Sequence, residues 1–445
     1  GPLVAGVLFK TGRGDHFLFA IHHLAVDGVS WRLLLEDLAT GYDQAKHKEA
    51  IRLPLKTASF QQWAEALAEY GQSRKVKKEQ SYWRKVLNTT VTPFPKDGDA
   101  VNNRMSDERH VTIQFTKKET NDLLKDANKA YRTEINDLLL TALLSATEEW
   151  TGKDNVVVDL EGHGRESIGD DTVDISRTVG WFTTMFPVAL SFSGSYDPGE
   201  RIQMVKEQLR RIPNKGIGFG LLAYLGEGNE KEQMSPSPIG FNYLGDFGDH
   251  AGIGEQAWQM SPLSSGVSLG MKNHRIHALE MNGMTLEGCL QFRISFNRWE
   301  YQDATIRTFA ESFKRHLNEL VNYCIAQENS LISPSDVGYA VLSLDAWKEI
   351  QTIHPAELVE EIRPLSPMQE GILFEGLKNP DSPAYFEQLS FIVNGDLDST
   401  HVQDSFQDLA VRHDILRTVF TTEGDQPLQL VLKQLPLEVK EVSLL

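Results

Sequence analysis

Two adjacent histidines, His22 and His23, end an apolar segment that is predicted to be a strand, and Asp27 follows after three intervening residues. Side chains that are neighbours on a strand point to opposite faces, so the two imidazoles are expected to lie in different environments. A histidine fixed at a strand end suits proton transfer near neutral pH, and Asp27 could brace the turn. The alternative is a pair of core histidines with satisfied hydrogen bonds and no chemical role.

The residues after Asp27 are suited to starting a helix. Gly28 allows the chain to turn sharply, and the hydroxyl of Ser30 is expected to cap the helix that Trp31 begins. Apolar residues recur at helical spacing from Leu34 to Tyr42 and predict its buried face.

A second polar group, Glu161-Gly-His-Gly-Arg-Glu166, directly follows the buried-strand pattern of residues 155–160. Gly162 and Gly164 permit unusual backbone angles and the close approach of another segment. From the residues alone, a solvated charged turn and a catalytic carboxylate at a strand end both remain open.

Neither a metal centre nor a nucleotide site is expected. His22, His23 and Asp27 have the chemistry of ligands, but no further ligand is spaced to complete a coordination shell. The glycine-rich segment 213–220 lacks the Gly-Lys-Ser/Thr ending of a phosphate loop and does not stand between a strand and a helix.

The composition argues against nucleic acid and membranes as partners. The net charge is −18, from 44 basic and 62 acidic residues, and such a chain is repelled by nucleic acid and anionic lipid. No apolar run approaches the roughly 18–20 residues of a membrane span, and no secretion signal is recognised. The two cysteines, Cys289 and Cys324, form no disulfide framework, so a cytoplasmic location is expected.

Strand and helix patterns alternate along the chain and predict an α/β layered fold. Residues 88–108 lose all periodicity and are expected to cross between two lobes, and 328–362 look like a linker. Strands are expected near 1–9, 16–21, 110–115, 155–160, 186–192, 239–244, 288–297 and 386–393. Helices are expected near 31–42, 59–70, 78–87, 116–131, 134–150, 200–212, 302–326 and 400–412.

Several of these segments resemble motifs of the condensation-domain superfamily of nonribosomal peptide synthetases, and in particular its epimerization branch. The first is His-His-Leu-Ala-Val-Asp-Gly at 22–28, with the extension Val-Ser-Trp at 29–31. The others are Glu-Gly-His-Gly-Arg-Glu at 161–166, Arg-Thr-Val-Gly-Trp-Phe-Thr-Thr at 177–184, the glycine-rich segment 213–220 and Phe-Asn-Tyr-Leu-Gly at 241–245.

This resemblance implies the two-lobed fold of chloramphenicol acetyltransferase and other coenzyme-A-dependent acyltransferases, with the active channel between the lobes. It implies an isomerase that inverts, from L to D, the α-carbon of an aminoacyl or peptidyl thioester in nonribosomal peptide biosynthesis. The substrate would be delivered on the phosphopantetheine arm of a peptidyl carrier protein, and neighbouring synthetase domains would be further partners. No tightly bound cofactor, metal ion, nucleic acid or membrane is implied.

Inversion requires a proton to leave one face of the α-carbon and another to return to the opposite face. The resemblance therefore implies His23 and Glu161 as the two acid–base groups, and His22 and Asp27 as further catalytic residues. The expected substrate- and enolate-binding residues are Asn242, Tyr243, Ser30 and Trp31. The expected structural residues of the motifs are Gly28, Arg165, Arg177, Gly180 and Trp181.

The expected order is an epimerization domain over 1–327 that lacks its N-terminal part, a linker over 328–362, and the beginning of a condensation domain over 363–445. The lobes of the first domain would be 1–105 and 106–327. Residues 365–371 and 412–420 resemble the opening motifs of a condensation domain. Two other functions remain open: amide-bond formation with His23 as the base, and a catalytically silent docking module for a carrier protein.

Overall fold

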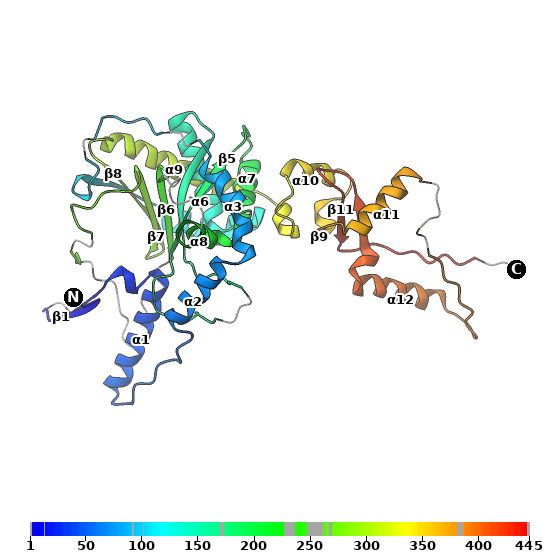
Figure 1. The fold of residues 1–445 in the computed structure, drawn as a ribbon, viewed down its shortest axis with the longest axis horizontal. Coiled ribbons are helices and arrows are strands. Elements are labelled where there is room, and N and C mark those ends of the chain that lie inside the picture. Colours follow the sequence, from blue (N-terminus) through cyan, green and yellow to red (C-terminus); the bar gives the residue numbers. More distant parts are fainter. Residues whose placement is uncertain are drawn as a thin grey trace. The chain divides into compact units, whose positions relative to one another are not determined.

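The structure is a computed structural model that describes residues 2–442 except 13, 91–92, 101, 170–172, 227–235, 247–260, 262, 267–268, 381–384 and 386. The chain divides into two compact units (Figure 1). The first contains Gly1–Asn128 and Thr133–Ala326, and the second contains Lys129–Arg132 and Gln327–Leu445. The segments that carry His23, Glu161 and Asn242 all lie in the first unit.

A six-stranded sheet forms the centre of the first unit, in the order β3-β8-β7-β6-β4-β5. β6 runs parallel to both of its neighbours, β4 and β7, and the remaining pairs are antiparallel. The strands are β3 (Glu108–Gln114), β4 (Asn155–Gly162), β5 (Thr184–Ser191), β6 (Ile239–Asp246), β7 (Leu279–Leu286) and β8 (Cys289–Asn297).

Two long helices, α6 (Ile135–Thr151) and α9 (Asp303–Ile325), pack against each other and against strands of this sheet (Figure 1). Phe292 of β8 meets Phe313 of α9 with ring centroids 5.0 Å apart, and Phe241 of β6 lies beside Phe292 at 5.8 Å. These buried rings identify the helix-covered face of the sheet. The side chains between them along each strand point to the opposite face.

The expected helices of the first unit are present, with small changes at their ends. Ser59 opens α2 (Phe60–Gly71) with the predicted capping box. α3 (Arg74–Leu87) begins four residues before the predicted 78, because the Ser73 hydroxyl accepts a hydrogen bond from the Val76 N–H. α6 ends at Gly152, whose φ of 70° suits glycine.

The predicted helix over 116–131 is divided. Thr116 caps α4 (Lys117–Asn121) with the expected capping box, but a wider π-helical turn follows at Asp122–Asp126 before the short α5 (Asn128–Tyr131). The predicted helix over 200–212 is α7 (Pro198–Arg210).

Within the described residues of the first unit, the strand β7 and the helix α8 (Ile217–Leu225) were not predicted from the sequence. α8 begins within the glycine-rich segment 213–220, and an added Cβ on Gly218 would lie 2.0 Å from the buried carboxylate of Glu79. This glycine therefore serves packing. β7 was missed because Asn and Gly interrupt it, although its burial alternates residue by residue.

The N-terminal hairpin pairs β1 (Val4–Phe9) with β2 (His16–Ile21), as predicted, and leads into α1 (Gly28–Lys46). The cap of α1 is Asp27 and not the expected Ser30, because the Asp27 carboxylate accepts a hydrogen bond from the Ser30 N–H at 2.6 Å. Gly28 is simply the first helical residue, and a Cβ there would meet open space. The expected sharp turn at Gly28 is therefore wrong.

The second unit contains a three-stranded sheet in the order β10-β11-β9, formed by Thr418–Thr421, Leu428–Leu432 and Val359–Pro364. Its helices are α10 (Leu344–Gln351), α11 (Pro367–Lys378) and α12 (Ser399–Arg412).

Residues 328–362 are part of this fold, which corrects their interpretation as a linker. Val337, Leu342 and Trp347 are buried in one core with Leu428 and Leu430 of β11. The Trp347 indole N–H also donates a hydrogen bond to the Ile332 carbonyl. Serine and proline in this stretch start short helices, which is why its composition resembles that of a linker.

The strand expected over 386–393 is not found in the described part of that segment, 387–393. Residue 386 itself lies outside the described residues. The apolar side chains that suggested the strand are exposed, with Ile392 at 95%.

Candidate active site

His23 lies just after β2, in a short 3-10 turn (His23–Ala25), and both histidines are exposed. His22 begins the turn, and its Nδ1 accepts a hydrogen bond from the Leu24 N–H at 3.2 Å. The two imidazoles thus differ because of the turn, and not because of strand alternation. His22 holds the backbone, which leaves His23 as the group able to face a substrate.

The tautomer of the neutral His23 imidazole follows from one contact. Nδ1 lies 2.8 Å from the carbonyl oxygen of Val26. A carbonyl only accepts hydrogen bonds, so Nδ1 carries the hydrogen and the lone pair is on Nε2. The Trp181 ring lies beside the imidazole, with centroids 5.7 Å apart, and is 47% exposed. His23 is therefore oriented to accept a proton at Nε2.

Glu161 lies near the end of β4, where its carboxylate accepts a hydrogen bond from the Asn242 side-chain amide of β6. Burial raises the pKa of Glu161, and the nearby charge of Glu280 raises it further. The charges of His23 and His277 and the Asn242 hydrogen bond act in the opposite direction. His23 and Glu161 are thus close enough to interact electrostatically, although they come from different elements.

Asn242 and Tyr243 do not share one environment, which corrects the expectation that both donate to the same enolate. They are neighbours on β6 and point to opposite faces. Asn242 reaches Glu161, whereas the Tyr243 hydroxyl lies 3.3 Å from the Thr285 hydroxyl of β7. Thr285 is fully buried, so Tyr243 belongs to the helix-covered face.

Asp27, Ser30 and Arg165 form a buried network that joins three of the motif segments. Asp27 is 2% exposed and accepts hydrogen bonds from the backbone N–H groups of Ser30 and Phe182. Arg165 contacts Asp27 at 3.5 Å and the Ser30 hydroxyl at 3.1 Å, and its guanidinium lies 3.9 Å above the Phe182 ring. The geometry gives Asp27 a positioning role, not one in proton transfer.

Ser30 is fully buried, and its hydroxyl bonds both the N–H and the carbonyl of Gly180. This placement corrects its expected role in substrate binding, because the hydroxyl joins two protein segments. Trp31 is half-buried and packs edge-on against Phe19 of β2, with ring centroids 5.4 Å apart. A contact between Trp31 and substrate stays a prediction.

Arg177 and Gly180 fix the segment that leads into β5. The Arg177 guanidinium forms ion pairs with Glu36 and Asp37 of α1 at 3.2 and 2.6 Å. An added Cβ on Gly180 would lie 2.3 Å from the Phe60 ring of α2, so no side chain fits there. Trp181 is thereby held beside His23.

Sequence reasoning missed three ionisable residues next to Glu161. Asp159 of β4, Glu280 of β7 and His277 just before β7 form a cluster in which His277 is 4% exposed. The alternation of apolar and polar residues from Leu279 to Leu286 was the signal for this strand.

The structure offers no metal centre among the residues that it describes, because no three His, Cys, Asp or Glu side chains are grouped to hold an ion. Within the same residues, no helix is long and apolar enough to cross a membrane.

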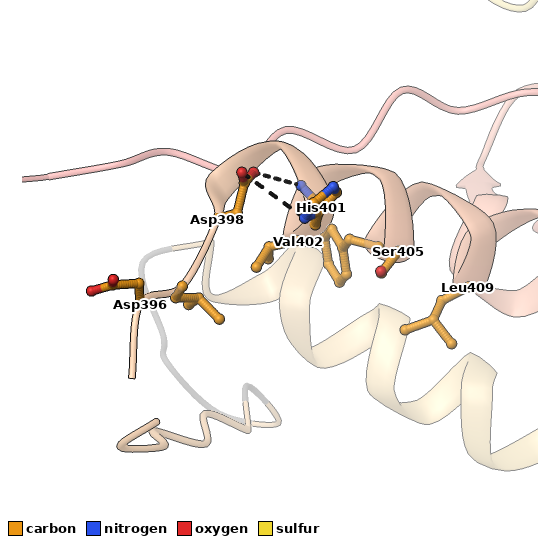
Figure 2. A pocket seen from close by; sticks show the side chains of 8 residues that line it. Asp396, Asp398, His401, Val402, Ser405 and Leu409 are labelled. Atoms are coloured by element: carbon orange, nitrogen blue, oxygen red, sulfur yellow. Dashed lines mark hydrogen bonds and ion pairs between the residues drawn. The ribbon is translucent and has the colours of Figure 1, made fainter. Parts of the chain in front are cut away.

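A separate pocket lies at the start of α12 in the second unit (Figure 2). Its Asp398 carboxylate accepts hydrogen bonds from the N–H groups of Thr400 and His401 and so caps the helix. We assign no chemistry to it. Its lining residues are Asp396, Leu397, Asp398, His401, Val402, Ser405, Phe406 and Leu409.

A protein-family model described as the condensation domain matches residues 1–343 and 359–444. Among curated proteins, one of the subunits of mycosubtilin synthase from Bacillus subtilis is 43% identical over 98% of this chain and 17% of that protein. Bacitracin synthase 3 of Bacillus licheniformis is 41% identical over 97% of this chain and 7% of that protein. Gramicidin S synthase 1 of Brevibacillus brevis is 42% identical over 79% of this chain and 33% of that protein. The chain thus spans a third or less of these relatives.

Among solved structures, the epimerization domain from the third module of tyrocidine synthetase B is 39% identical, with a TM-score of 0.69 over 74% of both chains. SgcC5 from Streptomyces globisporus is 16% identical, with a TM-score of 0.56 over 73% of both chains, which is a likeness of fold alone. These matches confirm the expected α/β fold of the chloramphenicol acetyltransferase type.

Proposed function

Since the chain belongs to the condensation-domain family, we propose that it works as an epimerase within a nonribosomal peptide synthetase. Its substrate is an aminoacyl or peptidyl thioester on the phosphopantetheine arm of a peptidyl carrier protein, and its product is the same thioester inverted at the α-carbon. The observation that carries the proposal is the pairing of His23, whose Nε2 lone pair is available, with a half-buried Glu161. The 39% identity to an epimerization domain supports it.

The reaction needs two proton transfers and no change in oxidation state. One group removes the α-proton, and the electron pair of the C–H bond moves into the thioester carbonyl to form an enolate. The other group returns a proton to the opposite face, and the carbonyl reforms. His23 Nε2 suits the first role when neutral, and burial favours a protonated Glu161 that can donate. In the reverse direction the two groups exchange roles.

Asn242 is the proposed positioning residue for this carboxyl group, since its side-chain amide donates to Glu161. The proposed inversion requires no tightly bound cofactor, because the thioester itself makes the α-proton more acidic. The carrier protein and neighbouring synthetase domains are the proposed partners.

Amide-bond formation is the competing activity. It needs one base near the attacking amine and gives no role to a second acid–base group such as Glu161. Its product, a dipeptidyl thioester, distinguishes it from inversion.

The test is incubation of the 445-residue chain in D2O with a carrier protein loaded with L-alanyl, L-valyl or L-phenylalanyl thioesters. Mass spectrometry and chiral analysis of the released amino acid should show solvent deuterium at the α-carbon and the D-enantiomer. His23→Gln and Glu161→Gln should each lower the rate by about 100-fold or more.

The matched controls are His110→Gln and Glu311→Gln, which alter exposed residues on β3 and α9 and should leave the rate unchanged. A dipeptide formed when a second loaded carrier is added would replace the proposal with condensation. If no deuterium entered the α-carbon with any of the loaded carriers, the chain would be a catalytically silent docking module.

A further inference from the structure

The polar face of the sheet carries a row of charges beside Glu161. In the register of the parallel strands, Asp159 of β4 pairs with Gly240 of β6, and Gly240 pairs with Glu280 of β7. Asp159 and Glu161 are two residues apart on one strand, so their side chains point to the same face. The carboxylates of Asp159 and Glu280 therefore lie on either side of Gly240, which has no side chain.

The His277 imidazole occupies this position beside Gly240. Its Nε2 lies 2.9 Å from the Asp159 carboxylate, and its Nδ1 lies 3.8 Å from the Glu280 carboxylate. Ser237 completes the arrangement, since its hydroxyl and its N–H both donate to Asp159, at 2.6 and 3.2 Å. The ring is thus fixed between two acids from different strands.

Gly240 makes this placement possible. An added Cβ on Gly240 would lie 2.6 Å from Nδ1 and 2.8 Å from Cε1 of His277, which is closer than real Cβ contacts. Any other residue at position 240 would push the imidazole away from its two partners.

The charges explain what the imidazole does there. Burial opposes a positive charge on His277, but its hydrogen bond to Asp159 and its ion pair with Glu280 prevail and raise its pKa to about 9. It is therefore an imidazolium at neutral pH, and it offsets one of the two carboxylates in the row. The charge of His277 lowers the pKa of Glu161, whereas that of Glu280 raises it.

The geometry points to His277 as a positioning residue of the acid–base site, whose imidazolium, held over Gly240 between Asp159 and Glu280, sets the protonation of Glu161. This inference rests on the proposed role of Glu161 in proton transfer. Without the imidazolium, the neighbouring row would carry two negative charges, and ionisation of Glu161 would become harder.

The other groups around the cluster do not replace this cation. Arg275 also acts on Glu280, but its guanidinium is engaged by Glu108 at 2.6 Å and by the Ser295 carbonyl at 3.0 Å. The charge of His23, which comes from the turn after β2, also lowers the pKa of Glu161. Within the described residues, His277 is thus a cation held by carboxylates of β4 and β7 that acts on Glu161.

The direct test follows the titration of Glu161 without using turnover. Carboxyl carbon NMR of glutamate-labelled protein, with Glu161→Gln to assign the signal, should show the Glu161 midpoint higher by about half a pH unit or more in His277→Gln. Gly240→Ala should give a shift in the same direction, although it removes no charge. Gly220→Ala, on α8 with open space around it, is the control and should leave the midpoint unchanged.

The pH–rate profile provides the second readout. Whether Glu161 must be protonated or ionised, the limb that it controls should move to higher pH in both variants by the amount seen by NMR. His277→Lys, which restores a cation, should return the midpoint toward the wild-type value. A Glu161 midpoint unchanged in His277→Gln would overturn the inference, even if inversion is observed. A shifted midpoint with no isotope exchange would show that His277 sets the protonation of Glu161, and it would reject the proposed function.

Discussion

Glu161 is held in surroundings that disfavour its charged form. Burial raises its pKa above the value in the unfolded chain, so the folded protein binds this proton more tightly. The ionised carboxylate therefore lowers stability. That cost is absent below the unfolded pKa, grows as the pH rises through the folded pKa, and then stays constant.

Glu161→Gln should consequently make the protein more stable at pH 7 to 8 while it removes activity. A glutamine resembles the protonated acid and can still accept the hydrogen bond from Asn242. Urea unfolding of both proteins between pH 4 and 8 is the measurement, and the gain should disappear near pH 4. Equal stability at pH 8, or a less stable variant, would show that the site favours the carboxylate.

At the scale of the elements, the sequence predicted what local rules determine. The capping boxes at Ser59 and Thr116 are readable because each depends on residues three positions apart. The cap of α1 was assigned to the wrong residue, because Asp27 and Ser30 both suit a cap and only the structure shows Ser30 bonded to Gly180.

The candidate site was predictable only in part, because contacts between distant segments cannot be read from local sequence rules. The motif segments identified His23 and Glu161 as candidates, but the network of Asp27 with Arg165 and Phe182 joins segments far apart in the chain. His277 escaped notice because its role depends on which strands lie beside β4. Strand order is a tertiary property that local periodicity does not contain.

Replacing Gly180 or Gly28 with alanine tests the packing described for α2 and the start of α1. Gly180→Ala should destabilise the protein by about 1–3 kcal/mol and reduce isotope exchange, because the new Cβ collides with Phe60 of α2 and moves the segment that holds Trp181 beside His23. Gly28→Ala should leave the free energy of unfolding unchanged or raise it by up to about 1 kcal/mol.

Urea unfolding and the exchange assay measure both variants. The position of Gly28 is open and helical, whereas that of Gly180 has no space, so the two substitutions should separate clearly. Equal tolerance at both positions would contradict the packing described for α2.

At the scale of the whole molecule, the second unit has a core of its own that includes residues 332–350. Trp347→Ala should remove about 3–5 kcal/mol of stability from this unit, since the indole is 1% exposed. Hydrogen exchange of the amides in β9 and β11 is the readout, and it should accelerate strongly. Val341→Ala, at a side chain that is 77% exposed in the same stretch, is the control. If the amides of β9 and β11 were equally protected from exchange in Trp347→Ala, residues 328–362 would be a linker and not part of the core.

The central claim is that His23 and Glu161 each serve one face of the α-carbon. The most direct measurement starts the reaction in D2O separately from the L- and the D-aminoacyl carrier protein, with His23→Gln and Glu161→Gln. Each variant should lose inversion, and each should retain slow deuterium exchange from only one enantiomer, a different one in the two variants. Inversion that survives in either variant, or identical exchange patterns in both, would contradict the two-base account.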